Sequence, residues 1–258
     1  FYTRSAGGAV EDNRVARFRA EGNVAARPEE FIFTMPAEPG PIHNGGQLAF
    51  GPDGKLYITI GDLAGSDNAQ NLNVRAGKVL RINDDGSIPA DNPFGPGNAT
   101  FVLGIRNSFG IAFDPVSGLP FATDNGTIAN DEVNRLVAGG NYGWPVIAYG
   151  RHYSGERIGR STAGEGVTQP AHYWEPSIAP SGHMVYSGRL WPEWAGDHFL
   201  GSLKFDYVAR LDPENGWAEE VIRAAETGRV RDIREAPDGS IWFLSVDRGA
   251  VFRMRPQG

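Results

Sequence analysis

Residues 41–62, PIHNGGQLAFGPDGKLYITIGD, decide the fold. A histidine beside two glycines precedes an alternating apolar stretch, a Pro-Asp-Gly turn, a second alternating stretch and an aspartate. Alternation with a period of two is typical of β-strands, and a tight turn between two such strands indicates a hairpin. The stretch therefore predicts the inner strands of a β-propeller blade, with His43 in the loop at the tip of the blade.

The same pattern recurs along the chain as an apolar strand, a turn, a second apolar strand and then a strand that carries Arg or Asn. It occurs in residues 48–62, 109–125, 182–204 and 233–247. Repeated short antiparallel strands of this kind indicate an all-β propeller with four-stranded antiparallel blades. A β-sandwich is the alternative that the pattern leaves open.

Three further strands are expected before this stretch, in the segments FYTR, VARFRA and EEFIFTM. They match the last three strands of a blade without its opening strand, which brings the total to about four and two-thirds blades. We therefore expect residues 1–258 to form a single propeller domain that lacks the first blade and the opening strand of the second.

The composition excludes several classes of protein. The chain of 258 residues carries a formal net charge of −7 and contains no cysteine. A nucleic-acid surface needs a basic face, so we expect no nucleic-acid partner. Disulfides and thiolate metal sites are excluded. No apolar run approaches the roughly 18 residues of a membrane-spanning helix.

His43 and Asp62 are the candidate acid–base pair. Asp62 follows the second strand of the hairpin, whose far end should return to the loop that holds His43. The carboxylate could then orient the imidazole and raise its basicity. Without such a partner, a loop histidine is usually an ordinary surface residue. The sequence has no HExxH zinc motif, no GxSxG motif and no phosphate-binding loop.

Four cations occupy comparable places in successive blades. Arg106 precedes an inner strand, Lys204 follows a second strand, and Arg229 and Arg231 lie two residues apart, so they share one face of a strand. Cations that converge near the axis of an acidic protein imply a multiply charged anionic ligand. The alternative is that each pairs with a nearby acid such as Asp232.

Oxygen ligands for Ca²⁺ are available in the stretch DNGTIANDEVNRLVAGGNYGWP. Gly126, Thr127, Glu132 and the backbone near Tyr142 are the candidates, because Ca²⁺ prefers hard oxygen ligands. The stretch does not match the twelve-residue loop of an EF-hand.

Seven motifs follow one another along nearly the whole chain. Each motif alone is a weak indication of a family, but the ordered set is specific. They are HNGGQLAFGPDGKLYITIGD, GKVLRIN, GIRNSFGIAFDP, NDEVNRLVAGGNYGWP, PSIAPSG, GSLK and GRVRDI. In this order they resemble the soluble quinoprotein sugar dehydrogenases, the glucose/aldose and sorbosone-type enzymes that use pyrroloquinoline quinone (PQQ). The resemblance implies a six-bladed propeller with the cofactor at the top of the axis and Ca²⁺ beneath it.

The resemblance also implies roles for individual residues. His43 matches the catalytic base, and Asp62 matches the carboxylate that orients it. The other matched positions are Arg106 and Asn107 at the quinone, Ser177 at the cofactor edge, Lys204, Arg229 and Arg231 at the cofactor carboxylates, Gly126 and Thr127 at the active-site Ca²⁺, and Glu132 and Tyr142 at a second, structural Ca²⁺. Thr127 stands where the family commonly has proline, a change that keeps the backbone carbonyl.

The implied reaction is oxidation of the C1 hydroxyl of an aldose to a lactone. His43 would take the hydroxyl proton while a hydride passes to PQQ, and Arg106 would stabilise the developing negative charge. An external electron acceptor would reoxidise the cofactor, and the family implies a periplasmic or secreted location. Two other functions stay open: a non-catalytic propeller that binds a sugar or a protein, and a Ca²⁺-dependent propeller lactonase. The His43–Asp62 pair and the cations favour the oxidoreductase.

Overall fold

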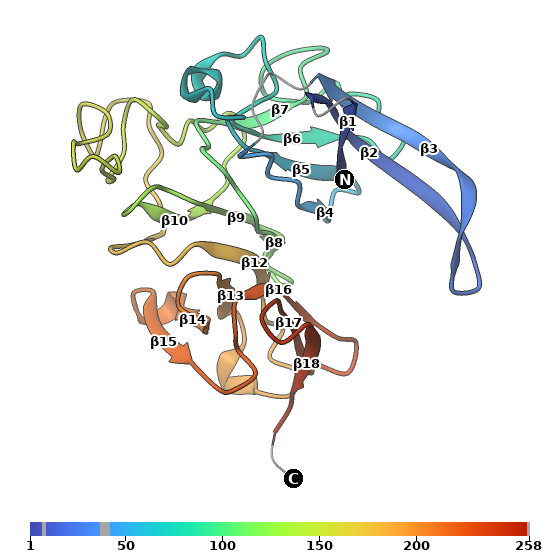
Figure 1. Cartoon of the computed structure of the whole chain (residues 1–258), viewed down its shortest axis with the longest axis vertical. Helices are drawn as coiled ribbons and strands as arrows, with labels where there is room; N and C mark the ends of the chain where they lie inside the picture. Colours follow the sequence, from blue (N-terminus) through green and yellow to red (C-terminus); the bar gives the residue numbers. More distant parts are fainter. Residues whose placement is uncertain (7–8, 37–41, 257–258) are drawn as a thin grey trace.

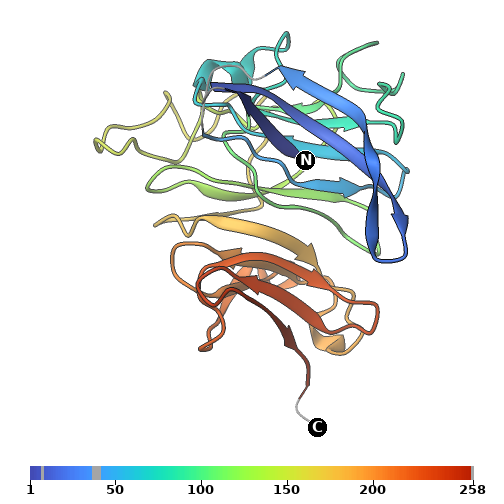
Figure 2. The ribbon, with the colours of Figure 1, turned by 45° about the vertical axis from the view of Figure 1, so that its right-hand side comes forward.

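The computed structural model describes residues 1–6, 9–36 and 42–256, so Pro41, at the start of the stretch that decides the fold, lies outside the described residues. The described chain forms five antiparallel sheets, which follow one another as the blades of a propeller (Figure 1). A view turned by 45° shows these sheets stacked from the N-terminal to the C-terminal blade (Figure 2). Within these residues, no helix has the length and apolarity needed to cross a membrane.

The strands run in chain order through the blades. The first blade consists of β1 (Tyr2–Ala6), β2 (Ala9–Glu21) and β3 (Val24–Pro36). The second consists of β4 (Leu48–Phe50), β5 (Leu56–Ile60), β6 (Lys78–Ile82) and β7 (Thr100–Leu103). The third consists of β8 (Ile111–Phe113), β9 (Pro120–Asp124), β10 (Asp131–Arg135) and β11 (His172–Trp174).

The fourth blade consists of β12 (Pro180–Val185), β13 (His198–Ser202), β14 (Val208–Asp212) and β15 (Ala218–Ile222). The fifth consists of β16 (Val230–Glu235), β17 (Ile241–Ser245) and β18 (Ala250–Met254). Short 3₁₀ helices lie between strands, at η1 (Ser66–Gln70), η2 (Pro192–Trp194) and η3 (Pro213–Asn215).

The expected number of blades is wrong. A six-bladed propeller with four-stranded blades, about four and two-thirds of them present, was expected; the structure has five blades, the first and last with three strands and the others with four. The number six came from the resemblance and not from the strands of this chain. The repeat in the sequence marks hairpins, but it does not determine how many sheets form or whether each gains a fourth strand.

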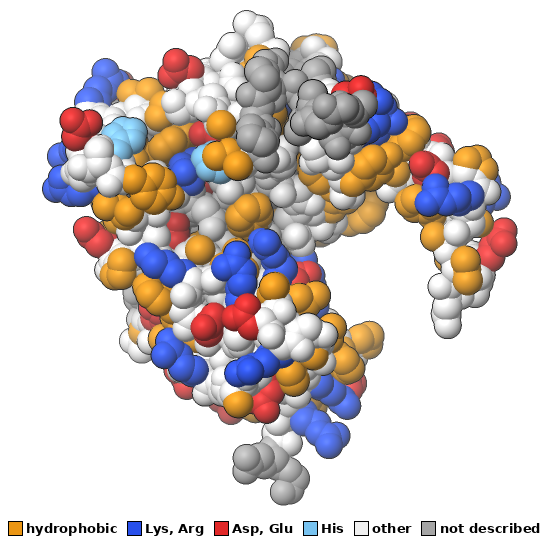
Figure 3. Space-filling view, in the orientation of Figure 1, with side chains coloured by type: hydrophobic (Ala, Val, Ile, Leu, Met, Phe, Trp, Pro, Cys, Tyr) orange, Lys and Arg blue, Asp and Glu red, His pale blue; other side chains and the backbone are white. Residues whose placement is uncertain are grey.

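The surface is hollowed between the β2–β3 hairpin and the fifth blade (Figure 3).

Apolar side chains on both faces of the middle blades hold neighbouring blades together. On β5, Ile58 faces the first blade and packs in one cluster with Phe33 and Met35. Tyr57, one residue earlier, faces the third blade and packs with Ala122 in another cluster. Because successive side chains of a strand point to opposite faces, one buried strand contributes to two cores. Similar clusters join the third blade to the fourth and the fourth to the fifth.

The blade order places the first strands β4, β8, β12 and β16 near the axis, where β8 neighbours β4 and β12, and β12 neighbours β16. In an antiparallel sheet, the loop that enters the first strand and the loop that leaves the second lie at the same end. The residues just before β4, β8, β12 and β16 and just after β5, β9 and β13 therefore gather at one end of the axis.

Candidate active site

A pocket of about 440 Å³ lies at this end of the axis. Of the residues predicted for the site, those that line it are His43, Arg106, Asn107, Gly126, Thr127, Ser177, Lys204 and Arg229. The loops before the first strands and after the second strands supply all eight. The structure thus brings together most of the predicted cofactor and base positions, and it leaves Asp62, Glu132, Tyr142 and Arg231 outside the lining.

His43 and Asp62 form the predicted pair. His43 Nδ1 lies 2.7 Å from Asp62 Oδ1, and the side chain of Asp62 is 3% exposed. The Ala64 N–H donates to the same Oδ1 at 3.0 Å, and the Trp144 indole N–H donates to Oδ2 at 2.9 Å. The carboxylate accepts from these donors, so Nδ1 of the neutral imidazole carries the proton and Nε2 is the free acceptor.

The loop that holds His43 requires glycine at close approaches. His43 itself has φ of 60°, a left-handed conformation that is rare for a residue with a side chain. A Cβ at residue 61 would lie 2.1 Å from the His43 carbonyl oxygen, and a Cβ at residue 45 would lie 2.6 Å from the Thr59 carbonyl oxygen. The glycines therefore let the loop lie directly on β5, which keeps His43 beside Asp62.

Arg106 and Asn107 are held by their backbone. Their N–H groups donate to Asp124, at 2.9 Å from Arg106 to Oδ2 and 2.7 Å from Asn107 to Oδ1. Burial raises the pKa of Asp124 to about 7, although these two donors oppose the shift. The Arg106 guanidinium donates to the carbonyl oxygens of Asn125 and Gly126, at 2.8 and 2.5 Å.

The cations have few acidic neighbours. Within the described part of the chain, Lys204, Arg229 and Arg231 form no ion pair, and Asp232 pairs with Arg234 at 3.2 Å. Local pairing with acids, the alternative to an anionic ligand, is therefore not what the structure has. Burial, and then the charge of Arg229, lowers the pKa of Arg231.

Arg229 and Arg231 are placed differently. Arg229 has φ of 43°, and its guanidinium donates to the Leu203 carbonyl at 3.0 Å. Strained backbone of this kind often marks functional sites. The Arg231 guanidinium lies over the Phe109 ring, 5.4 Å from its centroid, and Phe109 lines the pocket. Arg231 thus contacts a lining residue of the pocket without lining the pocket itself.

Three buried polar atoms on pocket residues have no hydrogen-bond partner among the described residues. They are Asn107 Oδ1, Asn125 Oδ1 and Ser177 Oγ. A buried polar group without a partner is costly, so such atoms indicate a missing ligand or water. Three cations also line the pocket, against the single carboxylate of Asp131. The three cations and the Ser177 hydroxyl are donors that fit PQQ, an anionic cofactor with carboxylates and carbonyl oxygens, whereas the two amide oxygens would accept from a donor of the ligand or from water.

The predicted Ca²⁺ ligands fit less well. The Gly126 carbonyl already accepts from Arg106, and a metal ion there would share that oxygen with a guanidinium. The Thr127 hydroxyl donates to the Arg151 carbonyl at the edge of the pocket. Among the described residues, no group of three or more Asp, Glu or His side chains is arranged to hold a metal. The site as it stands therefore does not fit Ca²⁺ at Gly126.

Glu132 and Tyr142 lie in the interior. Burial, and then the charge of Asp124, raises the pKa of Glu132 to about 8, and the Asn134 amide donates to its Oε2 at 3.0 Å. The Tyr142 hydroxyl accepts from the Val137 N–H at 3.0 Å, and burial raises its pKa to about 12. The second Ca²⁺ site, formed by the Glu132 side chain and the Tyr142 backbone carbonyl, stays a prediction.

Sequence reasoning does not find three acidic or aromatic residues of the site: Asp124, Asp131 and Trp144. Asp131 accepts from the N–H groups of Gly126 and Ala179, at 2.7 and 2.6 Å, and so fixes two loops of the pocket. A signal for Asp124 was available, because it ends β9 as Asp62 follows β5. Trp144 lies 82 residues from Asp62, and no local pattern predicts their contact.

Comparisons with known proteins identify the family of the chain. The Glucose / Sorbosone dehydrogenase family model matches residues 1–253. The aldose sugar dehydrogenase YliI of Escherichia coli K12 is 35% identical, over 83% of this chain and 60% of its own. This chain spans about three fifths of the length of the curated relatives it matches.

Two solved structures are similar in fold and sequence. The crystal structure of a glucose dehydrogenase is 31% identical, with a TM-score of 0.91 over 98% of this chain and 76% of that one. The PQQ-bound aldose sugar dehydrogenase of Streptomyces coelicolor is 29% identical, with a TM-score of 0.73 over 91% of this chain and 66% of that one. From the family match and the 35% identity, the chain belongs to the glucose/sorbosone dehydrogenase family.

Proposed function

We propose that this chain oxidises the C1 hydroxyl of aldose sugars to lactones, with PQQ as hydride acceptor and His43 as general base. One observation carries the proposal: the His43–Asp62 pair opens into a pocket whose lining cations have no acidic partner among the described residues. A base and an anion-binding wall in one pocket are what this oxidation requires. The sugar dehydrogenase family and its PQQ-bound member support the same choice.

His43 acts on the proton of the substrate. Its Nδ1 is held by Asp62, so Nε2 is free to accept the proton of the C1 hydroxyl. The buried carboxylate then stabilises the imidazolium that forms, as an orienting acid does in a catalytic triad. When bound, PQQ accepts the hydride that leaves C1 with its electron pair.

The cations bind and orient the cofactor. Lys204 and Arg229 line the pocket and Arg231 contacts the lining residue Phe109, so their charges would offset the carboxylates of PQQ. The buried Ser177 hydroxyl has no hydrogen-bond partner among the described residues and could donate to an oxygen of a bound cofactor. Arg106, held in place by Asp124 through its backbone, is the cation for negative charge that develops during the reaction.

No step of the proposal passes through Ca²⁺, because the Gly126 carbonyl is occupied by Arg106. An external acceptor would take the electrons after each turnover. We propose a periplasmic or secreted location, by analogy with the family.

Dye-linked turnover tests the proposal. PQQ, an aldose and an electron-accepting dye are added to the purified chain, with and without Ca²⁺, and dye reduction is followed. His43→Ala should lower turnover by about 10³-fold, because it removes the general base. PQQ binding, followed by fluorescence quenching, should stay unchanged in this variant because His43 is assigned to the substrate proton.

His152→Ala is the matched control, since His152 is exposed and does not line the pocket. It should keep full turnover. Absence of dye reduction with every aldose, together with absence of quenching by PQQ, would refute the proposed function. Quenching by PQQ without turnover would instead favour a binding role.

A further inference from the structure

Trp144 connects the two halves of the candidate site. Its side chain is 8% exposed and lies between Asp62 and Arg106. The indole N–H donates to Asp62 Oδ2 at 2.9 Å, and the Arg106 guanidinium lies 5.4 Å from the ring centroid. The ring does not line the pocket. Trp144 therefore touches both the partner of the base and the cation, without touching the space that a substrate would occupy.

The backbone of Trp144 is itself fixed. Its N–H donates to the Gly104 carbonyl at 3.1 Å, and its carbonyl accepts from the Gln70 amide at 2.7 Å. Gln70 also bonds Asn141 through both atoms of its amide, at 3.0 and 2.7 Å. The indole is thus held by residues from the second and third blades and has little freedom to leave Asp62.

The indole bond decides how the Asp62 carboxylate is oriented. Oδ1 has two donors, His43 Nδ1 and the Ala64 N–H, while Oδ2 has the Trp144 N–H. Without the indole donor, Oδ2 would be a buried acceptor with no partner among the described residues, and the carboxylate could rotate to seek another donor. Such a rotation would move Oδ1 away from His43, and the imidazole would lose its fixed tautomer.

We propose that Trp144 is a positioning residue for the oxidation: its indole N–H locks Asp62 so that His43 keeps Nε2 free, and its ring supports Arg106. The inference rests on the proposed function, and it adds a residue that touches neither substrate nor cofactor. A packing role alone would need the ring but not the N–H. The two roles are therefore separated by a variant that keeps an aromatic ring and removes the donor.

Trp144→Phe is that variant, and Trp174→Phe is its matched control. Trp174 is 5% exposed, and its indole nitrogen has no hydrogen-bond partner in the described part of the chain. Both changes remove the same atoms from a buried indole. Trp144→Phe should lower kcat about tenfold, with KM and PQQ affinity within about twofold of wild type. Trp174→Phe should leave kcat within about twofold.

An NMR readout that is independent of turnover accompanies the kinetics. In the wild-type chain, the ¹⁵N spectrum of the imidazoles should give His43 as the Nδ1–H tautomer, assigned with His43→Gln. Trp144→Phe should replace this signal with an average of the two tautomers. In Asp62→Asn, the Trp144 indole N–H resonance should move while that of Trp174 stays, which tests the contact even if Trp144→Phe does not fold.

The outcomes separate the two proposals. A wild-type chain without turnover refutes the proposed function, and the tautomer and indole signals then decide the role of Trp144 alone. Loss of kcat with the change in tautomer supports the positioning role. The role is overturned if Trp144→Phe keeps wild-type kcat and tautomer, if Trp174→Phe loses as much activity, or if the Trp144 indole resonance does not respond to Asp62→Asn.

Discussion

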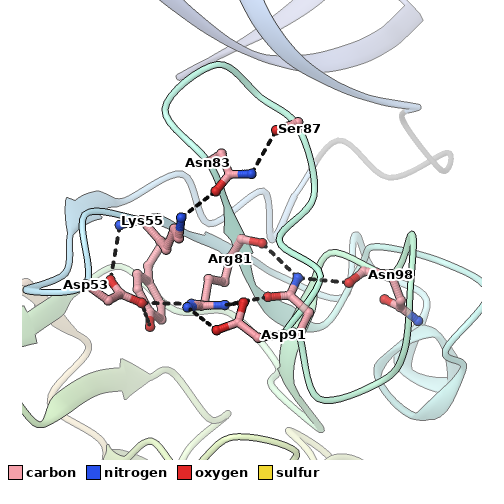
Figure 4. Close-up of polar contacts among 9 residues, drawn as sticks. Asp53, Lys55, Arg81, Asn83, Ser87, Asp91 and Asn98 are labelled. Carbon is pink, nitrogen blue, oxygen red and sulfur yellow. Dashed lines mark hydrogen bonds and ion pairs between the residues drawn. The ribbon is translucent and has the colours of Figure 1, made fainter.

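Arg81, on β6 of the second blade, and Arg229, at the pocket, have opposite surroundings. Arg81 Nε donates to Asp53 Oδ2 at 2.9 Å, and its two terminal nitrogens donate to the two oxygens of Asp91 at 2.9 and 3.1 Å (Figure 4). Asn92 Oδ1 accepts a further bond at 3.0 Å. The hydrogen bonds to Asp91 and Asp53 raise the pKa of Arg81. Arg229, by contrast, has a carbonyl as the acceptor of its guanidinium.

The contrast separates two uses of a cation. A nearly buried guanidinium with four hydrogen bonds to two acids and one amide joins strands and loops within one blade. Three cations that line one pocket with a single carboxylate, that of Asp131, destabilise the protein through repulsion, and binding of an anion offsets this repulsion. Changes at Arg81 should therefore alter stability, and changes at the pocket cations should alter ligand binding or turnover.

Among changes to the cations, the largest effect is expected from Arg106→Met. This change removes the charge nearest to the base pair, so kcat should fall about 100-fold or more. Steady-state kinetics with PQQ and an aldose measures it. Arg106→Lys keeps the charge but not the fork that reaches Asn125 and Gly126, and its kcat should lie between wild type and Arg106→Met. Equal activity of wild type and Arg106→Met would show that Arg106 serves the fold only.

Arg81→Met should act on stability instead. It leaves Asp53, Asp91 and Asn92 without their shared donor, so the free energy of unfolding should fall by about 2 kcal/mol. Urea unfolding measures this loss, and PQQ affinity should be unchanged. Arg229→Met in the same assay should leave the apo stability equal or slightly higher, since it relieves repulsion with Arg231. A loss of stability as large as that of Arg81→Met would remove the distinction between the two groups.

Two buried histidines, His183 and His198, should have a smaller effect on stability, through its dependence on pH. His183 Nε2 lies 2.9 Å from His198 Nδ1. Burial holds the pKa of His183 well below 6.5, and the charges of His198 and Arg234 add to this shift. Burial also lowers the pKa of His198 to about 4, although the charge of Asp114 opposes that shift. Between pH 6.5 and about 4, the unfolded chain binds protons that the folded chain does not, so stability falls as the pH falls.

The free energy of unfolding of the wild type should fall between pH 7 and 5.5, and His198→Gln should make this fall smaller by about 1 kcal/mol. The pH dependence of stability must be compared between variant and wild type, because Asp124 and Glu132 also contribute to it in both proteins. Their pKa values are raised in the fold, so their effect on stability has the opposite sign to that of the histidines. Their contribution to stability is complete at low pH and is lost as the pH rises. Urea unfolding at several pH values gives the two slopes, and identical slopes would show that His198 is not neutral in the fold.

The sequence predicts local features of this molecule better than global ones. The hairpin pattern of residues 48–62 correctly predicts β4 and β5, and with them the contact of His43 with Asp62. The convergence of Lys204 and Arg229 also follows from the repeat, because each occupies a loop at the same end of its blade. A period of two and a turn are local properties, and they suffice for such predictions.

The features that the sequence does not predict depend on distant packing. The number of blades depends on how sheets stack, which no hairpin pattern encodes. The hydrogen bond between Trp144 and Asp62 joins two blades. The Gly126 carbonyl accepts a hydrogen bond from Arg106, and no local pattern predicts this contact either. Arg229 and Arg231 were expected to share one face of a strand, but Arg229 precedes β16 with a φ of 43°, and Arg231, on β16, lies over the Phe109 ring.

The central claim is that the cations without acid partners hold an anionic cofactor. Calorimetric titration of PQQ into the wild-type chain, Arg229→Met and Arg81→Met tests it most directly. We predict binding at one site in the wild type, about 100-fold weaker binding in Arg229→Met, and unchanged binding in Arg81→Met. Absence of binding in the wild type, or equal affinity in wild type and Arg229→Met, would contradict the account.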